Sequence, residues 1–66
     1  MKLLRLKNVM DITGLGRSSI YNYMKEGTFP KQVKITANLS AWVESEIEDW
    51  IIERIAERDD DKSPNL

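Results

Sequence analysis

A polar and cationic helical face precedes Gly27 in the first half of the chain. At about 100° per residue, the side chains of Ser18, Asn22 and Lys25 fall on one side of a helix over residues 17–25. No acidic residue interrupts this side. Asparagine can pair bidentately with adenine, serine can bond base edges or phosphate, and lysine can reach guanine or phosphate. This side of the helix therefore has the chemistry of duplex DNA recognition.

Two further residues extend this face, and other basic residues lie near it in the sequence. Arg17 stands at the helix start, where its side chain can swing toward a phosphate, and Tyr21 flanks the polar side. We expect DNA contacts from nine residues: Lys7, Arg17, Ser18, Ser19, Tyr21, Asn22, Lys25, Lys31 and Lys34.

These contacts divide by chemistry. Asn22 and Ser18 are expected to read the base sequence. Phosphate or mixed contacts are expected from Arg17, Lys25 and Tyr21, whereas Lys7, Lys31 and Lys34 would position the protein on phosphates.

A first helix must hold this recognition helix. Leu6, Val9 and Met10 recur at helical spacing and predict a helix over residues 7–13. The opposite side of the second helix carries Ile20, Met24, Tyr23 and Gly16, which are expected to be buried. Gly14, Leu15 and Gly16 form the connection, in which glycine tolerates a positive φ and Leu15 enters the angle between the helices. The pattern indicates a helix-turn-helix; the alternative is an ordinary corner of a small helical bundle.

The period of the sequence changes after the second helix. Gly27 and Pro30 end that helix, and Phe29 is expected to pack back on the core. Val33 and Ile35 then alternate with polar residues, which predicts a short strand, and residues 39–43 form a plausible return strand. Beside a recognition helix, this hairpin would be a wing. Lys31 and Lys34 on it would touch phosphates, or merely solvate the outer face of the strand.

The last predicted helix covers residues 44–58. Its core side is expected to contain Ile47, Trp50, Ile51 and Ile55, with Trp42 just before it. Another side is a continuous acidic stripe made of Glu46, Asp49, Glu53 and Glu57. Such a stripe is either a solvated surface or a surface that avoids DNA and receives a basic protein partner.

An apolar patch remains outside this core. Ile52 and Ala56 fall away from Ile47 and form the best candidate surface for self-association. Residues 59–66 show no apolar periodicity and are expected to be a disordered acidic tail. The domain is therefore expected to span residues 1–58.

Composition restricts the possible functions. The 66 residues form one small domain without cysteine or histidine. The chain therefore has no disulfide and no thiolate or imidazole ligand, and we expect no metal site, no cofactor and no enzymatic activity. No signal peptide or membrane-spanning run is visible, so we expect a cytoplasmic protein with no membrane partner.

Charge is distributed unevenly along the chain. The net charge is −1, which is unlike a typical DNA-binding protein. However, residues 1–34 carry +5 and residues 35–66 carry −6. The basic half contains the predicted recognition helix and can attract phosphate locally. The alternative is a chance imbalance in a short chain.

The sequence resembles the AlpA-like prophage regulators, small DNA-binding proteins with a MerR-type winged helix-turn-helix. The resemblance covers roughly residues 4–58. It is carried by Arg5-Leu6-Lys7, Thr13-Gly14-Leu15, Arg17-Ser18, Ile20-Tyr21, Lys25-Glu26-Gly27, Phe29-Pro30, Trp42 and Glu44-Ser45-Glu46-Ile47. The chain departs from the family at Gly16, where serine is usual, and at Thr36-Ala37-Asn38, where the wing usually has glycine and a basic residue.

The resemblance implies a bacterial or phage-encoded regulator of prophage or genomic-island genes. We therefore expect a mainly α fold with a small β-hairpin, a winged helix-turn-helix of three helices plus a wing. The expected partner is double-stranded DNA, bound by a homodimer or by tandem copies. The alternatives are an excisionase-like factor that bends DNA and recruits an integrase, and a protein-interaction module that uses the acidic last helix.

Overall fold

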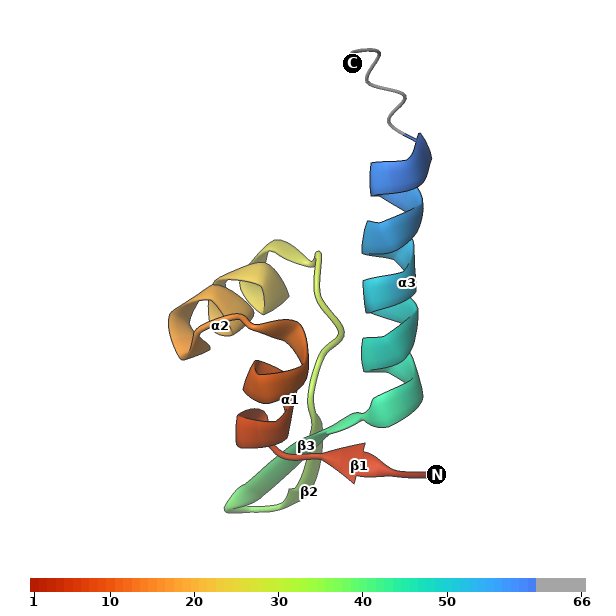
Figure 1. Cartoon of the computed structure of the whole chain (residues 1–66). Coiled ribbons are helices and arrows are strands. Elements are labelled where there is room, and N and C mark those ends of the chain that lie inside the picture. Colours follow the sequence, from red (N-terminus) through yellow and green to blue (C-terminus); the bar gives the residue numbers. More distant parts are fainter. Residues whose placement is uncertain (61–66) are drawn as a thin grey trace.

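The computed structural model describes residues 1–60 as three helices and one small antiparallel sheet (Figure 1). The helices are α1 (Leu6–Thr13), α2 (Arg17–Glu26) and α3 (Glu44–Asp60), and the strands are β1 (Leu3–Leu4), β2 (Val33–Thr36) and β3 (Leu39–Val43). This arrangement confirms the predicted winged helix-turn-helix, with the β2–β3 hairpin as the wing.

The turn between α1 and α2 is fixed by local hydrogen bonds. Thr13 Oγ1 donates to the carbonyl oxygen of Val9 at 2.7 Å and accepts the N–H of Leu15 at 3.2 Å. Gly14 adopts φ 75° and donates its N–H to the carbonyl oxygen of Met10 at 2.8 Å. Leu15 packs against the core from this turn, as expected.

The two glycines of this turn have different roles. Only Gly14 requires the positive φ that the sequence suggested for the connection. Gly16 has φ −80° and ψ 166°, an extended conformation open to any residue, and it is the exposed N-cap of α2 rather than part of the buried side. The α2 N-terminus has no capping side-chain hydrogen bond as a result.

The sheet has β3 in its centre, in the order β1-β3-β2. β1 was not predicted, because two residues show no periodicity and their pairing is a long-range contact. Leu4 of β1 is buried opposite Trp42, and the N–H of Glu44 donates to the carbonyl oxygen of Lys2 at 2.9 Å. A register shift between Lys34 and Thr36 interrupts the β2–β3 ladder near the hairpin turn.

Two tryptophans hold the segment between α2 and β2. Trp42 is buried and its indole N–H donates to the carbonyl oxygen of Pro30 at 3.0 Å. The indole N–H of Trp50 donates to the carbonyl oxygen of Thr28 at 2.6 Å. Phe29 is buried between these bonds and meets the Trp50 ring edge-on, with 4.9 Å between ring centroids. The expected packing of Phe29 on the core is confirmed.

The core is small and centres on Val9, Ile20, Trp42 and Ile47. Ile55 was expected in it but is 44% exposed, because α3 extends beyond the body of the domain at that point (Figure 1).

The predicted burial of Tyr23 is also wrong, since its side chain is 37% exposed. α2 rests on the core mainly through Ile20 and the half-buried Met24, and this narrow contact leaves Tyr23 at its margin.

The end of α3 differs slightly from its predicted position. The helix continues to Asp60, two residues beyond the predicted end at residue 58, a difference within the usual range for a helix end. The remainder of the predicted tail lies outside the described residues.

The turn geometry makes a stability prediction. A Cβ on Gly14 would meet nothing within 4 Å, so Gly14→Ala should lower the free energy of unfolding through its positive φ alone, by about 1 kcal/mol. Gly16→Ser should instead raise it by a few tenths of a kcal/mol, because serine supplies a cap to α2. Urea denaturation of both variants checks this contrast, and equal changes would contradict it.

Candidate nucleic-acid interface

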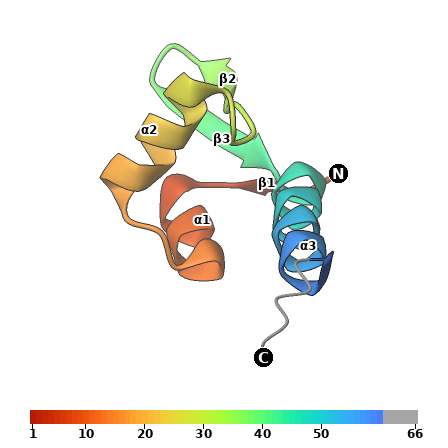
Figure 2. The ribbon, with the colours of Figure 1, turned by 90° about the horizontal axis from the view of Figure 1, so that it is seen from above.

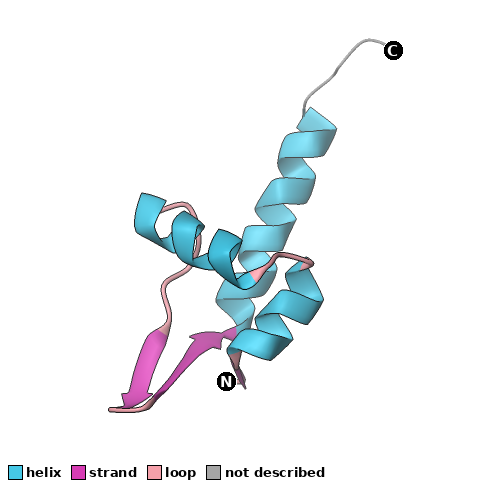
Figure 3. Ribbon diagram, turned by 90° about the vertical axis from the view of Figure 1, so that its left-hand side faces the viewer, coloured by secondary structure: helices cyan, strands magenta, loops and turns pink. Residues whose placement is uncertain are grey.

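The outer side of α2 is open to solvent. Ser18, Asn22 and Lys25 are exposed, while Ile20 on the opposite side is completely buried. Figure 3 shows α2 crossing the front of the molecule with α3 behind it. Ten residues make α2 roughly 15 Å long, a length that suits the major groove of B-DNA.

A hollow of about 430 Å³ is lined by residues of the hairpin, of α2 and of the start of α1. Its polar lining includes Arg5 and Lys7 from the α1 end, Tyr21 from α2 and Asn38 from the hairpin turn. No carboxylate lines this hollow among the residues that the structure describes. A concave surface with only positive charge concentrates phosphate near it.

Lys34 belongs to the same side of the sheet. It pairs with Ser40 on β3, and Ser40 lines the hollow. Because directly paired residues of neighbouring strands project to the same face of a sheet, the Lys34 side chain lies on the face that carries this hollow.

A second, shallower hollow of about 380 Å³ lies at the C-terminal end of α2. Lys25 and Lys31 line it together with Tyr21 and Met24. Tyr21 therefore stands between the two hollows, with basic residues on both sides of it. The structure thus brings together Lys7, Lys25 and Lys31 around one exposed aromatic ring.

The remaining candidates lie outside the two hollows. Arg17 and Ser18 are exposed at the N-terminal end of α2, and Asn22 is exposed opposite Ile20. Ser19 is half-buried on the flank of the helix and is the least accessible of the nine predicted contact residues.

The predicted contact cations have no acidic partners within residues 1–60. The ion pairs there are Lys2–Glu44 at 3.8 Å, Arg54–Glu57 at 2.6 Å and Arg58–Asp59 at 2.9 Å. Phosphate binding would therefore break no ion pair at any of the basic candidates, which are Lys7, Arg17, Lys25, Lys31 and Lys34.

Arg5 is a candidate that the sequence reasoning did not select. Its backbone N–H donates to Asn8 Oδ1 at 3.2 Å at the N-terminus of α1. Arg5 is exposed and lines the hollow of about 430 Å³. The available signal was a basic residue placed directly before the first helix, two positions from Lys7.

The carboxylates of α3 do not cover this interface. The acidic stripe of Glu46, Asp49, Glu53 and Glu57 is exposed and faces the connection between α2 and β2. α3 lies on the opposite side of the molecule from the outer surface of α2 (Figures 2 and 3). The outer surface of α2 and the acidic stripe therefore face different sides, and they adjoin at Lys31, which lines both the hollow beside Lys25 and the hollow beside the stripe.

Two other kinds of site are absent from residues 1–60. No group of three or more acidic side chains there is arranged to hold a metal ion. None of the helices in this part of the chain has both the length and the apolar character that crossing a membrane requires.

Comparison with known proteins gives consistent matches. The profile of a family described as "Prophage CP4-57 regulatory protein (AlpA)" matches residues 2–55. The ORF88 protein of Enterobacteria phage P4 is 42% identical over 57 residues, which are 86% of this chain and 65% of that protein. The DNA-binding transcriptional activator AlpA of Escherichia coli K12 is 32% identical over 60 residues, with 82% of this chain and 86% of that protein covered. Because the family profile covers most of the chain and the E. coli relative is matched over most of its length, this chain belongs to the AlpA family of prophage regulatory proteins.

Proposed function

We propose that this chain is a sequence-specific DNA-binding transcriptional regulator of prophage or genomic-island genes, acting in the bacterial cytoplasm. The observation that carries the proposal is the exposed outer side of α2, surrounded by cations without acidic partners in residues 1–60. The description of the E. coli relative as a DNA-binding transcriptional activator supports it.

In this proposal, α2 enters the major groove and the hairpin lies against the flanking backbone. Asn22 and Ser18 contact base edges, because both are exposed on the side opposite Ile20. Lys25, Arg17 and Tyr21 make phosphate or mixed contacts. The basic residues around α2 then position the protein on phosphates; they are Arg5, Lys7, Lys31 and Lys34.

The salt dependence of DNA affinity tests the phosphate contacts. With about four phosphates neutralised, log affinity should fall with log salt concentration at a slope near −3.6. Lys25→Ala should weaken binding to all sequences and reduce the size of this slope by about one unit. Arg58→Ala is the control, since it removes a cation from α3. Absence of binding at low salt would contradict the proposal and favour a protein-interaction module.

Base readout is tested by a different variant. Asn22→Ala should reduce discrimination between specific and random duplexes by about 1 to 3 kcal/mol, because it removes a bidentate partner of a base. The specific site is obtained first, by selection from a random duplex library. Competition binding then compares Asn22→Ala with Lys25→Ala, and equal losses on both kinds of DNA for both variants would contradict the assigned roles.

A single recognition helix reads only a few base pairs, so we propose that the chain binds as a homodimer or as tandem copies. Ile52 is 59% exposed on α3, with Ala56 and Ile55 beside it. This apolar patch is the proposed surface for self-association.

Sedimentation tests this patch. Ile52→Glu should convert a wild-type dimer to a monomer, because it places a charge in an apolar contact. Ile35→Glu is the matched control, since Ile35 is an exposed isoleucine of the hairpin. If wild type and Ile52→Glu have the same sedimentation coefficient, the proposed dimer is wrong.

A further inference from the structure

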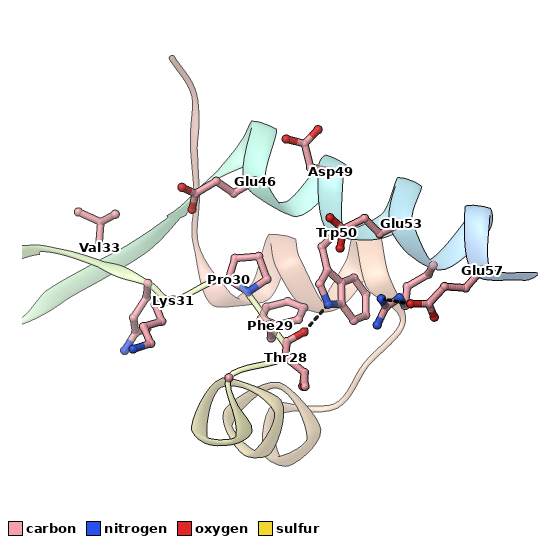
Figure 4. Close-up of a pocket in the computed structure, with 13 residues that line it drawn as sticks. Thr28, Phe29, Pro30, Lys31, Val33, Glu46, Asp49, Trp50, Glu53 and Glu57 are labelled. Atoms are coloured by element: carbon pink, nitrogen blue, oxygen red, sulfur yellow. Dashed lines mark hydrogen bonds and ion pairs between the residues drawn. The ribbon is translucent and has the colours of Figure 1, made fainter.

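A groove of about 950 Å³ separates α3 from the segment of residues 27–33 (Figure 4). Its apolar floor is formed by Phe29, Pro30 and Trp50. The acidic stripe of α3 forms one wall along its whole length, and all four of its carboxylates belong to the lining: Glu46, Asp49, Glu53 and Glu57. The groove therefore combines an apolar floor with a row of negative charges, and two cations, Lys31 and Arg54, complete its charged lining.

The lining keeps a net negative charge, because its four carboxylates outnumber the two cations Lys31 and Arg54. Within residues 1–60, Glu46, Asp49 and Glu53 have no cation within 4 Å, and only Glu57 is paired, with Arg54. Successive members of the stripe stand three or four residues apart on one helix, where like charges repel. A cation bound in the groove would relieve this repulsion.

Arg54 shows how the groove accommodates a guanidinium group. Its Cζ lies 5.2 Å from the centre of the Trp50 ring, and its Nη2 lies 2.6 Å from Glu57 Oε2. The aromatic face and the carboxylate together form a suitable site for an arginine side chain. Three more carboxylates continue along the same wall without such a partner.

The charge of the groove decides between the possible occupants. Phosphate is repelled by the stripe, so a nucleic acid does not fit. A second copy of this chain does not fit either, if the proposed function is right, because the cations around α2 would be bound to DNA. We propose that the groove is the docking site for a basic segment of another protein, with an apolar side chain on Trp50 and Pro30 and arginine or lysine on the free carboxylates.

The dimensions of the groove set the length of this segment. From Glu46 to Glu57, α3 rises roughly 16 Å, which equals about five residues of extended chain. A suitable probe is a fluorescein-labelled hexapeptide that alternates arginine and leucine. Its binding is measured by fluorescence anisotropy at low salt, with a hexapeptide of glutamate and leucine as the negative probe.

The first pair of variants tests the wall. The combined change Glu46→Gln, Asp49→Asn and Glu53→Gln should weaken binding of the arginine–leucine peptide about tenfold. A matched variant carries Glu48→Gln, Asp59→Asn and Asp60→Asn, which remove the same charge from α3 outside the groove. It should change the dissociation constant less than about twofold. Equal weakening by both variants would overturn the proposal, because the peptide would then respond only to net charge.

The second pair tests the guanidinium site. Arg54→Ala frees Glu57 and the face of Trp50, so it should tighten peptide binding about threefold. Arg58→Ala makes the same change of charge outside the groove and should leave the affinity nearly unchanged. Equal tightening by both variants would overturn the assignment of this site.

Two further measurements separate this proposal from the others. The groove variant should bind duplex DNA at least as tightly as wild type, so a failure of peptide binding leaves the proposed regulator function intact, and a failure of DNA binding leaves the groove testable. If the groove variant changes sedimentation without changing peptide binding, the occupant is a second copy and the proposal is wrong.

Discussion

The two indole hydrogen bonds to the segment after α2 are the constraint on which the arrangement of the other elements depends. Trp42 reaches this segment from the sheet and Trp50 reaches it from α3, and each indole N–H satisfies one of its carbonyl oxygens, on Pro30 and Thr28. Phe29 is buried between them. Because this segment leads directly from α2 into the wing, the two bonds fix the recognition helix, the hairpin and the last helix relative to one another.

This arrangement reconciles an acidic protein with a DNA-facing surface. The net charge of −1 describes neither side of the molecule. The basic residues gather around α2 and the adjacent hollow, while the stripe of α3 faces the other side of the connecting segment. Phosphate near α2 is therefore attracted by local charge, while the carboxylates gather in a separate groove that shares Lys31 with the α2 surface.

The sequence predicted the elements well where local signals were strong. Helical spacing gave α1 and α2, and Gly14 and Gly27 both take the positive φ expected at helix ends. The alternation of apolar and polar residues predicted the hairpin. The exposure of Ile55 could not be predicted, because it depends on where the body of the domain ends along α3. The pairing of β1 could not be predicted either, because it depends on which distant segment lies next to it.

In the candidate interface too, features with local sequence signals were predicted and features that depend on distant segments were not. The outer side of α2 followed from angular spacing alone, and its predicted exposure at Ser18, Asn22 and Lys25 is confirmed. Arg5 was missed because its position beside the hollow depends on the hairpin folding next to α1. The acidic stripe was visible in the sequence, but Phe29 and Pro30 of the apolar floor come from a segment far from α3 in the chain.

The short first strand has a consequence for the order in which the chain folds. β1 pairs Leu3 with Val43, so the sheet joins the beginning of the domain to the start of α3. The backbone hydrogen bonds of α1 and α2 need only nearby residues, but helices of eight and ten residues are marginal alone, and their Val9 and Ile20 pack with Trp42 and Ile47. The sheet likewise cannot be completed on the ribosome until residue 43 has emerged. The packing of the helix pair and the closure of the sheet therefore both wait until the C-terminal half has been made.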